Sequence, residues 1–419
     1  MPDKPPSLST FEAVAQMPSA SFRALRVLFS HIGGIADEYD EGAWSAFLTS
    51  FKELCPSGDQ TLGEKDKAAE LDNGISPEPS TDPPSTWTIT LDAEKKAKLC
   101  QIIDAVARKT PMQGHLIRQG ALTMLFSHFE GALAALLHLY YERYPAALPA
   151  DKQTLTLTDL RQVGSVSEAE KLIVGKEVDS VLRQGTEEQI AYFRNRLKIK
   201  VEPLIGLMSS LVEVAQRRNI YVHNYGKVNR QYLASVDQAL ATQYQAETGK
   251  KLQLSTDYLL SSIDTVDAVA AMLIQTCWRK WDKPKDADSN LLSHIYEALQ
   301  EQRYEYVKVL AVFAKGADMV EDVSRRIVVI NHAIALRETG DQEGVNRIIQ
   351  ETDWSAASLR FSLALHVLRK EQDGFLKLLP RVVAAEQITV EELQEWPLFK
   401  PWRGQGWFDS TLAGIKPTP

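Results

Sequence analysis

The chain contains very little cysteine. Its 419 residues include three, Cys55, Cys100 and Cys277, and these lie far apart in the sequence. No two of them have the short spacing of a zinc site, and three scattered thiols do not make the framework of a disulfide-rich secreted domain. We therefore expect no structural metal and no disulfide, which is typical of a protein in a reducing cytoplasm.

Long apolar runs and excess positive charge are also scarce. Residues 1–6 are polar and rich in proline, without the apolar core of a signal peptide, and no run approaches the roughly 18 apolar residues of a membrane helix. The net charge of −8 argues against a protein that coats nucleic acid, although it leaves room for a local basic site. These absences predict a cytoplasmic protein with no membrane partner.

The composition is that of an ordinary globular protein, with 44% hydrophobic and 24% charged residues. A chain of this length has room for two or three domains of roughly 100 to 200 residues each. Apolar residues recur at helical spacing through most of it, so we expect an all-α fold. The predicted parts are a helical N-terminal region over 1–111, a helical bundle over 112–283 and a C-terminal helical-repeat domain over 288–419, with a linker at 283–288.

The N-terminal region is predicted to hold helices around a disordered loop. Apolar residues between Ser19 and Leu54 have helical spacing, and the Gly33-Gly34 pair suggests a break between two helices. Residues 56–86 are rich in Ser, Gly, Pro and charge, and cannot bury enough surface to offset their ordering entropy. Asp92 resembles an N-cap for a helix over 93–108. Two roles stay open: a sensing or partner-binding element, and a plain helical extension.

A wide apolar stripe over 117–144 predicts a central bundle helix. Glu130 lies on this stripe, and an acid on a buried helix is costly unless it is paired. Two interpretations follow. Glu130 faces solvent, or it orients Arg218 or His223 from across the bundle.

A second long helix, beginning near Pro203, carries the candidate site. At 100° per residue, Asn219 and His223 lie about 40° apart on one face and one turn from each other. The long side chain of Arg218 can reach over the turn toward them. Gly226 is expected to stop the helix just past the histidine.

This set of side chains suits RNA cleavage. Attack of a ribose 2′-hydroxyl on the adjacent phosphate requires a proton acceptor near neutral pH, which histidine provides. The pentacoordinate phosphate gathers negative charge that a guanidinium can bind through two hydrogen bonds. Neither a metal nor a cofactor is required. Alone, an arginine and a histidine at this spacing also occur in many helices as a structural pair.

The run from Arg218 to Asn224, followed by Gly226, resembles the motif of the HEPN superfamily (higher eukaryotes and prokaryotes nucleotide-binding domain). Its members share an Arg, a polar residue, several variable positions and a His at the end of a bundle helix. Residues 125–130 are similar to part of the first long helix of that family, and 252–281 to its closing helix. The resemblance covers roughly residues 112–283, and only the motif is specific.

The resemblance implies an all-α domain that forms a homodimer with two motifs facing one cleft. It further implies a metal-independent endoribonuclease that leaves a 2′,3′-cyclic phosphate, acting as a toxin or in anti-phage defence by abortive infection. Carried over residue by residue, His223 is the acid or base, Arg218 the phosphate clamp and Asn219 a polar helper. Glu130 and Arg217 are candidates for orienting the substrate. For Arg217 this means contact with the RNA backbone, and the alternative is a plain solvent-exposed arginine.

The segment 151–200 is longer than a minimal HEPN bundle requires. Its polar and charged residues have helical potential, with candidate helices over 167–183 and 187–196. A dimer contact, a basic face and a solvated connector all stay open as its role.

The C-terminal third shows weak self-similarity. Polar stretches starting at Leu299, Leu336 and Leu368, about 37 and about 32 residues apart, each join two apolar helical segments. Such spacing is typical of helix-pair repeats and resembles tetratricopeptide-like repeats. The aromatic end, over 396–408, is expected to cap the last repeat. An alternative role for this region is docking of a peptide, an antitoxin, or a phage or regulatory protein.

Two other functions remain as alternatives to the ribonuclease. One is a non-catalytic scaffold in which the bundle dimerises, the repeats bind a partner, and Arg218 and His223 are paired with acids. The other is a toxin whose motif is modified by a partner nucleotidyltransferase.

Overall fold

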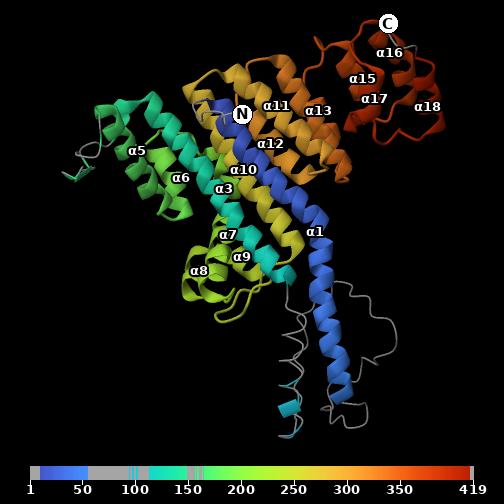
Figure 1. Ribbon diagram of the computed structural model, residues 1–419. Helices are drawn as coiled ribbons and strands as arrows, with labels where there is room; N and C mark the ends of the chain where they lie inside the picture. The colour runs from blue at the N-terminus through green and yellow to red at the C-terminus, as the bar shows by residue number, and fades with distance from the viewer. Residues whose placement is uncertain are drawn as a thin grey trace, which may run out of the picture. The chain divides into compact units, whose positions relative to one another are not determined.

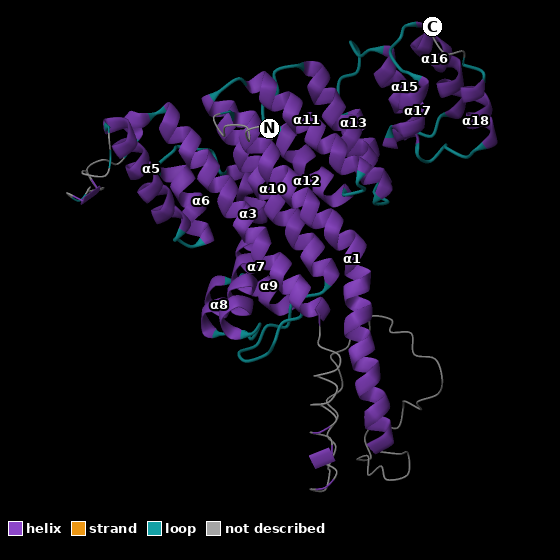
Figure 2. Ribbon diagram, viewed as in Figure 1, coloured by secondary structure: helices purple, strands orange, loops and turns teal. Residues whose placement is uncertain are grey.

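The protein is all-α in the computed structural model (Figure 1), as the sequence predicts. The structure describes residues 10–54, 113–148 and 165–415, with residues 94, 97–98, 101, 156, 158–159 and 163 between them. Within these residues there is no strand, and one isolated bridge joins Lys227 and Lys251 (Figure 2). Most of the predicted helix over 93–108, and the whole loop over 56–86, lie outside the described residues.

The first helix, α1, is continuous over Phe11–Leu54, so the predicted division into two helices at Gly33-Gly34 is wrong. Glycine inside a helix costs about 1 kcal/mol relative to alanine but does not by itself end the helix. Gly33 also has a packing role, because a Cβ there would lie 2.5 Å from Cγ2 of Thr256. Glycine is therefore needed at position 33 because the helix backbone lies close to Thr256, and not because the chain turns there.

The chain forms two compact units. One contains residues 1–26, 122–253 and 257–419, and the other contains residues 27–121 and 254–256. The domain boundaries taken from the sequence stay predictions. The linker expected at 283–288 is wrong, because α11 begins at Pro284 and runs to Gln300. Proline suits the first turn of a helix, where no intrahelical N–H bond is lost. Ala287 and Leu291 of this helix are buried in the core.

Three long helices carry or contact the candidate residues: α3 (Gln113–Arg143), α7 (Ile205–Asn224) and α10 (Thr256–Trp281). In the larger unit, α3 contacts α10 where the rings of Tyr140 and Trp281 lie 4.8 Å apart. The start of α1 packs on α10, where Phe11 stacks on Trp278 at 5.7 Å. These aromatic contacts join α1, α3 and α10.

Both α3 and α10 are long and apolar enough to cross a membrane by length and composition alone, contrary to the expectation that no such run exists. In their most apolar windows, 56% and 72% of the residues are buried inside the protein. Burial of that kind is also found in the core helices of globular proteins. The cytoplasmic location stays a prediction.

The segment after α3 forms a helical hairpin. After the short helix η1 (Pro145–Ala147), α5 (Val166–Leu182) and α6 (Thr186–Asn195) pack together. The hydroxyl of Tyr192 donates to Glu177 at 2.6 Å and lies 2.5 Å from the hydroxyl of Tyr141 on α3. This partly buried chain of polar groups fastens α5 and α6 to α3, so these two helices are packed elements and not a solvated connector.

The short helices η2 (Glu202–Leu204), α8 (Arg230–Ser235) and α9 (Gln238–Gln243) flank α7. The C-terminal third then contains helices of six to 17 residues. They are α11, α12 (Tyr304–Lys315), α13 (Asp322–Glu338), α14 (Gln342–Gln350), α15 (Leu359–Leu368), α16 (Gln372–Ala384), α17 (Val390–Glu395), the short η3 (Pro397–Phe399) and α18 (Gly406–Ala413).

The three self-similar stretches of the C-terminal third do join pairs of helices: α11 to α12, α13 to α14, and α15 to α16. Each turn places one residue in the left-handed region, at φ 60° for Gln302, 82° for Gly340 and 62° for Lys370. In each, the next N–H donates to the carbonyl five residues back, at 2.8 to 2.9 Å. The repeat predicted from the sequence is therefore a repeat of the helix-ending turn.

The aromatic end closes the last helix pair, as expected. Phe375 of α16 is fully buried, and its ring centroid lies 4.9 Å from that of Trp402. Phe399 and Phe408 pack on the same ring at 6.1 and 6.0 Å.

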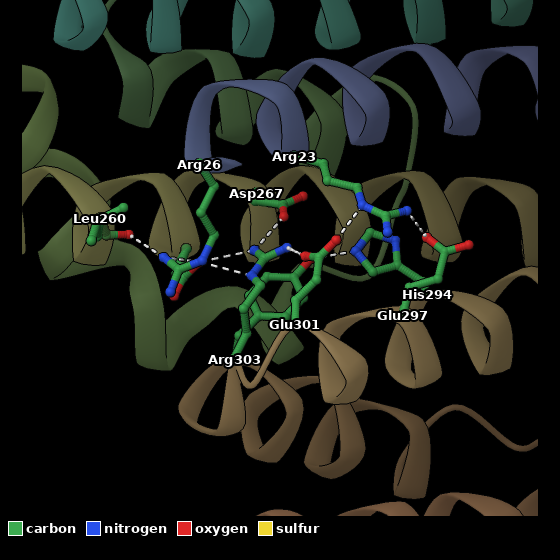
Figure 3. Close-up of polar contacts among 10 residues, drawn as sticks. Arg23, Arg26, Leu260, Asp267, His294, Glu297, Glu301 and Arg303 are labelled. Atoms are coloured by element: carbon green, nitrogen blue, oxygen red, sulfur yellow. Dashed lines mark hydrogen bonds and ion pairs between the residues drawn. The ribbon is translucent and has the colours of Figure 1, made fainter. Parts of the chain in front are cut away.

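A polar network ties α1 to α10 and α11 (Figure 3). Arg303, which is 4% exposed, donates to Asp264 at 3.0 Å and to Asp267 at 2.6 Å. Arg26 of α1 pairs with Asp264 at 3.0 Å, and Arg23 pairs with Glu297 at 3.0 Å. The buried charges of Arg303 and Asp267 thus compensate each other, and more exposed ion pairs surround them where the three helices meet.

Candidate functional site

The end of α7 is a tight left-handed turn. Tyr225 has φ 55° and Gly226 φ 78°, and both backbone N–H groups donate to the carbonyl of Ile220. The predicted stop is therefore present, although the left-handed residues begin one position before Gly226. A Cβ on Gly226 would lie 2.8 Å from the ring of Tyr221, so this turn requires glycine for both its φ angle and its space.

The buried face of α7 carries a charged residue, Glu213, that is hydrogen-bonded to three other side chains. Glu213 accepts hydrogen bonds from Arg217 at 2.7 Å, from the hydroxyl of Tyr232 at 2.6 Å and from the hydroxyl of Tyr258 at 2.7 Å. Burial, and then the charge of Glu213, raises the pKa of Tyr258 well above 10. Tyr258 therefore stays a hydrogen-bond donor at neutral pH.

Arg217 is 2% exposed, so both interpretations that placed it at the surface are wrong. Its guanidinium lies between the rings of Tyr244 and Tyr258, at 4.2 and 3.9 Å from their centroids. It also donates to the carbonyl of Gln253 at 2.9 Å. A guanidinium so enclosed cannot reach RNA, and its role is to fix α7 on α9 and α10.

Arg218 points the other way and meets α3. Its Nη2 lies 3.2 Å from Oε1 of Glu130, and its guanidinium carbon lies 4.9 Å from the centre of the Phe126 ring. Its side chain stays 25% exposed, and its Nε is buried without a hydrogen-bond partner. Of the two interpretations of Glu130, the structure therefore supports pairing with Arg218.

Burial raises the pKa of Glu130, and the charge of Arg218 partly opposes that rise. The carboxylate of Glu130 thus loses part of its hydration, and the positive charge of Arg218 partly compensates for that loss. This arrangement holds the guanidinium in one place while leaving part of its surface accessible to an anion.

Asn219 and His223 lie on the outer face of α7. Asn219 is partly exposed and His223 is exposed. Neither side chain has a hydrogen bond to another residue within the described part of the chain. Both are open to a ligand or to a second protein surface.

An open cleft of about 510 Å³ lies beside Arg218. Its wall is largely polar and comes from α3, the α5–α6 turn, α7 and α8. The lining residues are Glu130, Leu182, Arg183, Gln184, Gly185, Thr186, Glu187, Glu188, Gln189, Val212, Ala215, Gln216, Arg218, Asn219, Gln231 and Ser235.

The cleft brings Glu130, Arg218 and Asn219 together, whereas His223 is not part of its lining. One turn of α7 separates His223 from Asn219. Among the described residues, no group of three or more His, Cys, Asp and Glu is arranged to hold a metal ion.

Sequence reasoning missed two parts of the site. The α5–α6 turn, with Arg183 and Glu187, and the residues Gln231 and Ser235 of α8 reach the cleft through tertiary packing and carry no local motif. The pairing of Glu213 with Arg217 could have been predicted from the sequence. The two residues are four apart, and Glu213 lies on an apolar face, where an isolated acid requires a partner.

No protein-family model, curated protein or solved structure matches the chain. Membership of the HEPN superfamily therefore rests on the resemblance of residues 218–224 and stays a proposal.

Proposed function

We propose that the protein is a HEPN-type endoribonuclease that acts as a homodimer, as a toxin or an effector of anti-phage defence. The observation that carries the proposal is the position of Arg218. It is held by Glu130 and Phe126 beside an open cleft, with Asn219 next to it and an exposed histidine one turn away on the same helix.

In this mechanism Arg218 binds the scissile phosphate and stabilises the charge that develops on it. His223 accepts the proton of the attacking 2′-hydroxyl or protonates the leaving oxygen, which gives a 2′,3′-cyclic phosphate and a 5′-hydroxyl. Asn219 hydrogen-bonds the phosphate or the imidazole. Glu130 acts only through Arg218, whose direction it fixes.

The dimer completes the site. His223 is exposed and lies outside the cleft lining of its own chain. A second copy that packs against this face supplies another histidine and another arginine, and it shields the reacting phosphate from water.

The test is cleavage of RNA by purified protein in the presence of EDTA. The parent is expected to cut, whereas His223→Ala and Arg218→Ala lose at least about 100-fold in rate, the size typical of removing a proton-transfer group or a charge-stabilising donor. His138→Ala and Arg194→Ala, which change exposed residues outside the cleft, serve as matched controls. Cleavage by either site variant at the parental rate would contradict the mechanism.

A non-catalytic scaffold is the second candidate, and the Arg218–Glu130 ion pair favours it. A guanidinium already paired with a carboxylate can serve the fold alone, and three carboxylates line the adjacent cleft. Expression in a host separates the two functions. A ribonuclease toxin inhibits growth and His223→Ala relieves the inhibition, whereas a scaffold gives the same growth with both chains.

A further inference from the structure

The cleft beside Arg218 has the size and the lining of a recognition pocket. Its volume of about 510 Å³ falls within the range of roughly 300 to 1,000 Å³ that is typical of small-ligand sites. Four separate elements contribute to its wall, which is polar over most of its extent. A single nucleoside is the piece of RNA that fits such a space.

The charges of the cleft decide which part of RNA can enter. Glu130, Glu187 and Glu188 contribute three carboxylates, against the guanidinium groups of Arg183 and Arg218. A phosphodiester backbone running through the cleft would meet these three carboxylates, and repulsion between like charges disfavours it. A neutral base avoids this repulsion, so the backbone stays at Arg218 and the base enters the cleft.

The three carboxylates differ in what they can bind. Glu130 is paired with Arg218. Glu188 folds back against Gly185 at the start of its own helix, where a carboxylate is favourable. Glu187 is exposed, and within the described residues its side chain has neither an ion pair nor a hydrogen bond. It is the carboxylate open to a ligand.

Hydrogen-bond donors complete the lining. Arg183 at the α5–α6 turn, Asn219 on α7 and Gln231 on α8 all border the cleft. In the described part of the chain none of these three side chains has an intramolecular partner. The cleft therefore offers one free carboxylate acceptor together with a guanidinium and two amides.

Guanine matches this combination. It presents two adjacent N–H donors, N1 and N2, on one edge and two acceptors, O6 and N7, on another, which arginine binds in the commonest specific base contact. Adenine and cytosine present a single amino donor, and uracil a single imino donor between two carbonyls. Only guanine satisfies a carboxylate through two hydrogen bonds while leaving acceptors for a guanidinium.

We propose that the cleft binds a guanine base of single-stranded RNA, with Glu187 accepting from N1 and N2 and Arg183 donating to O6 and N7. The base adjoins the phosphate bound at Arg218. This assignment rests on the proposed ribonuclease function for its biological meaning, but binding of the base is measurable without cleavage.

The first experiment is titration of the parent protein with each of the four nucleoside 3′-monophosphates, in which calorimetry or NMR measures binding. We expect guanosine 3′-monophosphate to bind at least about fivefold more tightly than the other three, which is the lower end of the discrimination that a good bidentate base contact provides. Glu187→Gln abolishes the preference. Glu247→Gln, the same change at an exposed acid outside the cleft, keeps it. Equal affinity for all four nucleotides, or an unchanged preference in Glu187→Gln, would overturn the assignment.

The second experiment maps cleavage sites on an RNA that contains all 16 dinucleotide steps. We expect parental cuts to lie next to guanosine and Glu187→Gln cuts to lose that bias. If the parent cuts without base preference, the base assignment fails and the ribonuclease stands. If the parent never cuts but prefers the guanine nucleotide in the titration, the ribonuclease fails and the base site stands.

Discussion

Two neighbouring arginines on α7 have opposite environments. Arg217 is enclosed by Tyr244, Tyr258 and Glu213, whereas Arg218 borders an open cleft. One residue along a helix is a rotation of 100°, which is enough to carry a side chain from the core to the surface. The buried arginine fixes the helix, and the other keeps part of its guanidinium accessible from the cleft.

The pair provides an internal test of this division. Arg217→Met leaves Glu213 as a buried carboxylate without its cation, and we expect a loss of about 3 to 5 kcal/mol in the free energy of unfolding. Arg218→Met breaks a partly exposed ion pair, for which at most about 1 kcal/mol is expected. Urea denaturation measures both. Equal losses in the two variants would contradict the division.

At this scale the sequence predicts the residue types of the site but not their neighbours. Arg218, Asn219 and His223 follow from helical spacing and from the resemblance to a family motif. The burial of Arg217 does not follow, because Tyr244 and Tyr258 are 27 and 41 residues further along the chain and only tertiary packing brings them to the guanidinium. Similarly, Arg183 and Glu187 belong to the cleft through the packing of a hairpin.

At the scale of the elements, the junction of α1, α10 and α11 contains a histidine that makes the stability of the fold depend on pH. His294 contacts the hydroxyl of Tyr306 through Nε2 at 2.6 Å, among Asp267, Arg303 and Glu297. Burial lowers the pKa of His294 below its ordinary value of 6.5, while the nearby acids partly oppose that effect. The folded state therefore favours the neutral ring.

The sign of the resulting pH dependence follows from proton binding. Below pH 6.5 the unfolded chain binds a proton at this residue more readily than the folded chain, so stability falls as the pH falls. The slope for one such group is at most about 1.4 kcal/mol per pH unit. We expect His294→Gln to lose less stability than the parent between pH 7 and 5.5.

Denaturation of both chains at several pH values checks this. Burial also lowers the pKa of His128 and His332, but these are present in both chains and cancel in the comparison. Between pH 8 and 7 the difference between the chains should stay constant. Parallel stability curves below pH 6.5 would rule out a role for His294.

The sequence predicts helices better than it predicts their ends. The apolar spacing predicted the all-α fold, α3 and α7, and the recurring polar stretches predicted the three helix-joining turns of the C-terminal third. The break at Gly33-Gly34 was wrong because α1 runs on through both glycines. The linker at 283–288 was wrong because α10 ends at Trp281 and α11 already begins at Pro284. Gly33 lies against Thr256, and Pro284 occupies the first turn of α11.

At the scale of the whole molecule, the net charge of −8 bears on the proposed RNA substrate. A uniformly acidic protein repels nucleic acid at long range, and that repulsion weakens as salt screens it. A local site therefore has to supply the attraction. In the proposed dimer, a second copy of Arg218 would double the positive charge that the scissile phosphate meets.

A dimeric active site makes the activity depend on protein concentration. We expect the rate of RNA cleavage per chain to be constant at high concentration and to fall on dilution through the dissociation constant of the dimer. Light scattering on the same samples should show the particle mass halve over that range. A species of single-chain mass with full activity would exclude a shared site.

The turn that ends α7 also affects how a genetic selection for inactive variants should be interpreted. Any side chain at Gly226 would displace the ring of Tyr221, whose hydroxyl donates to the carbonyl of Leu252, and would loosen the end of the helix that presents His223. Survivors would therefore include Gly226 substitutions along with His223 and Arg218 substitutions. The abundance of each protein distinguishes them, since loss of a chemical group leaves the folded chain in the cell and loss of the turn removes it.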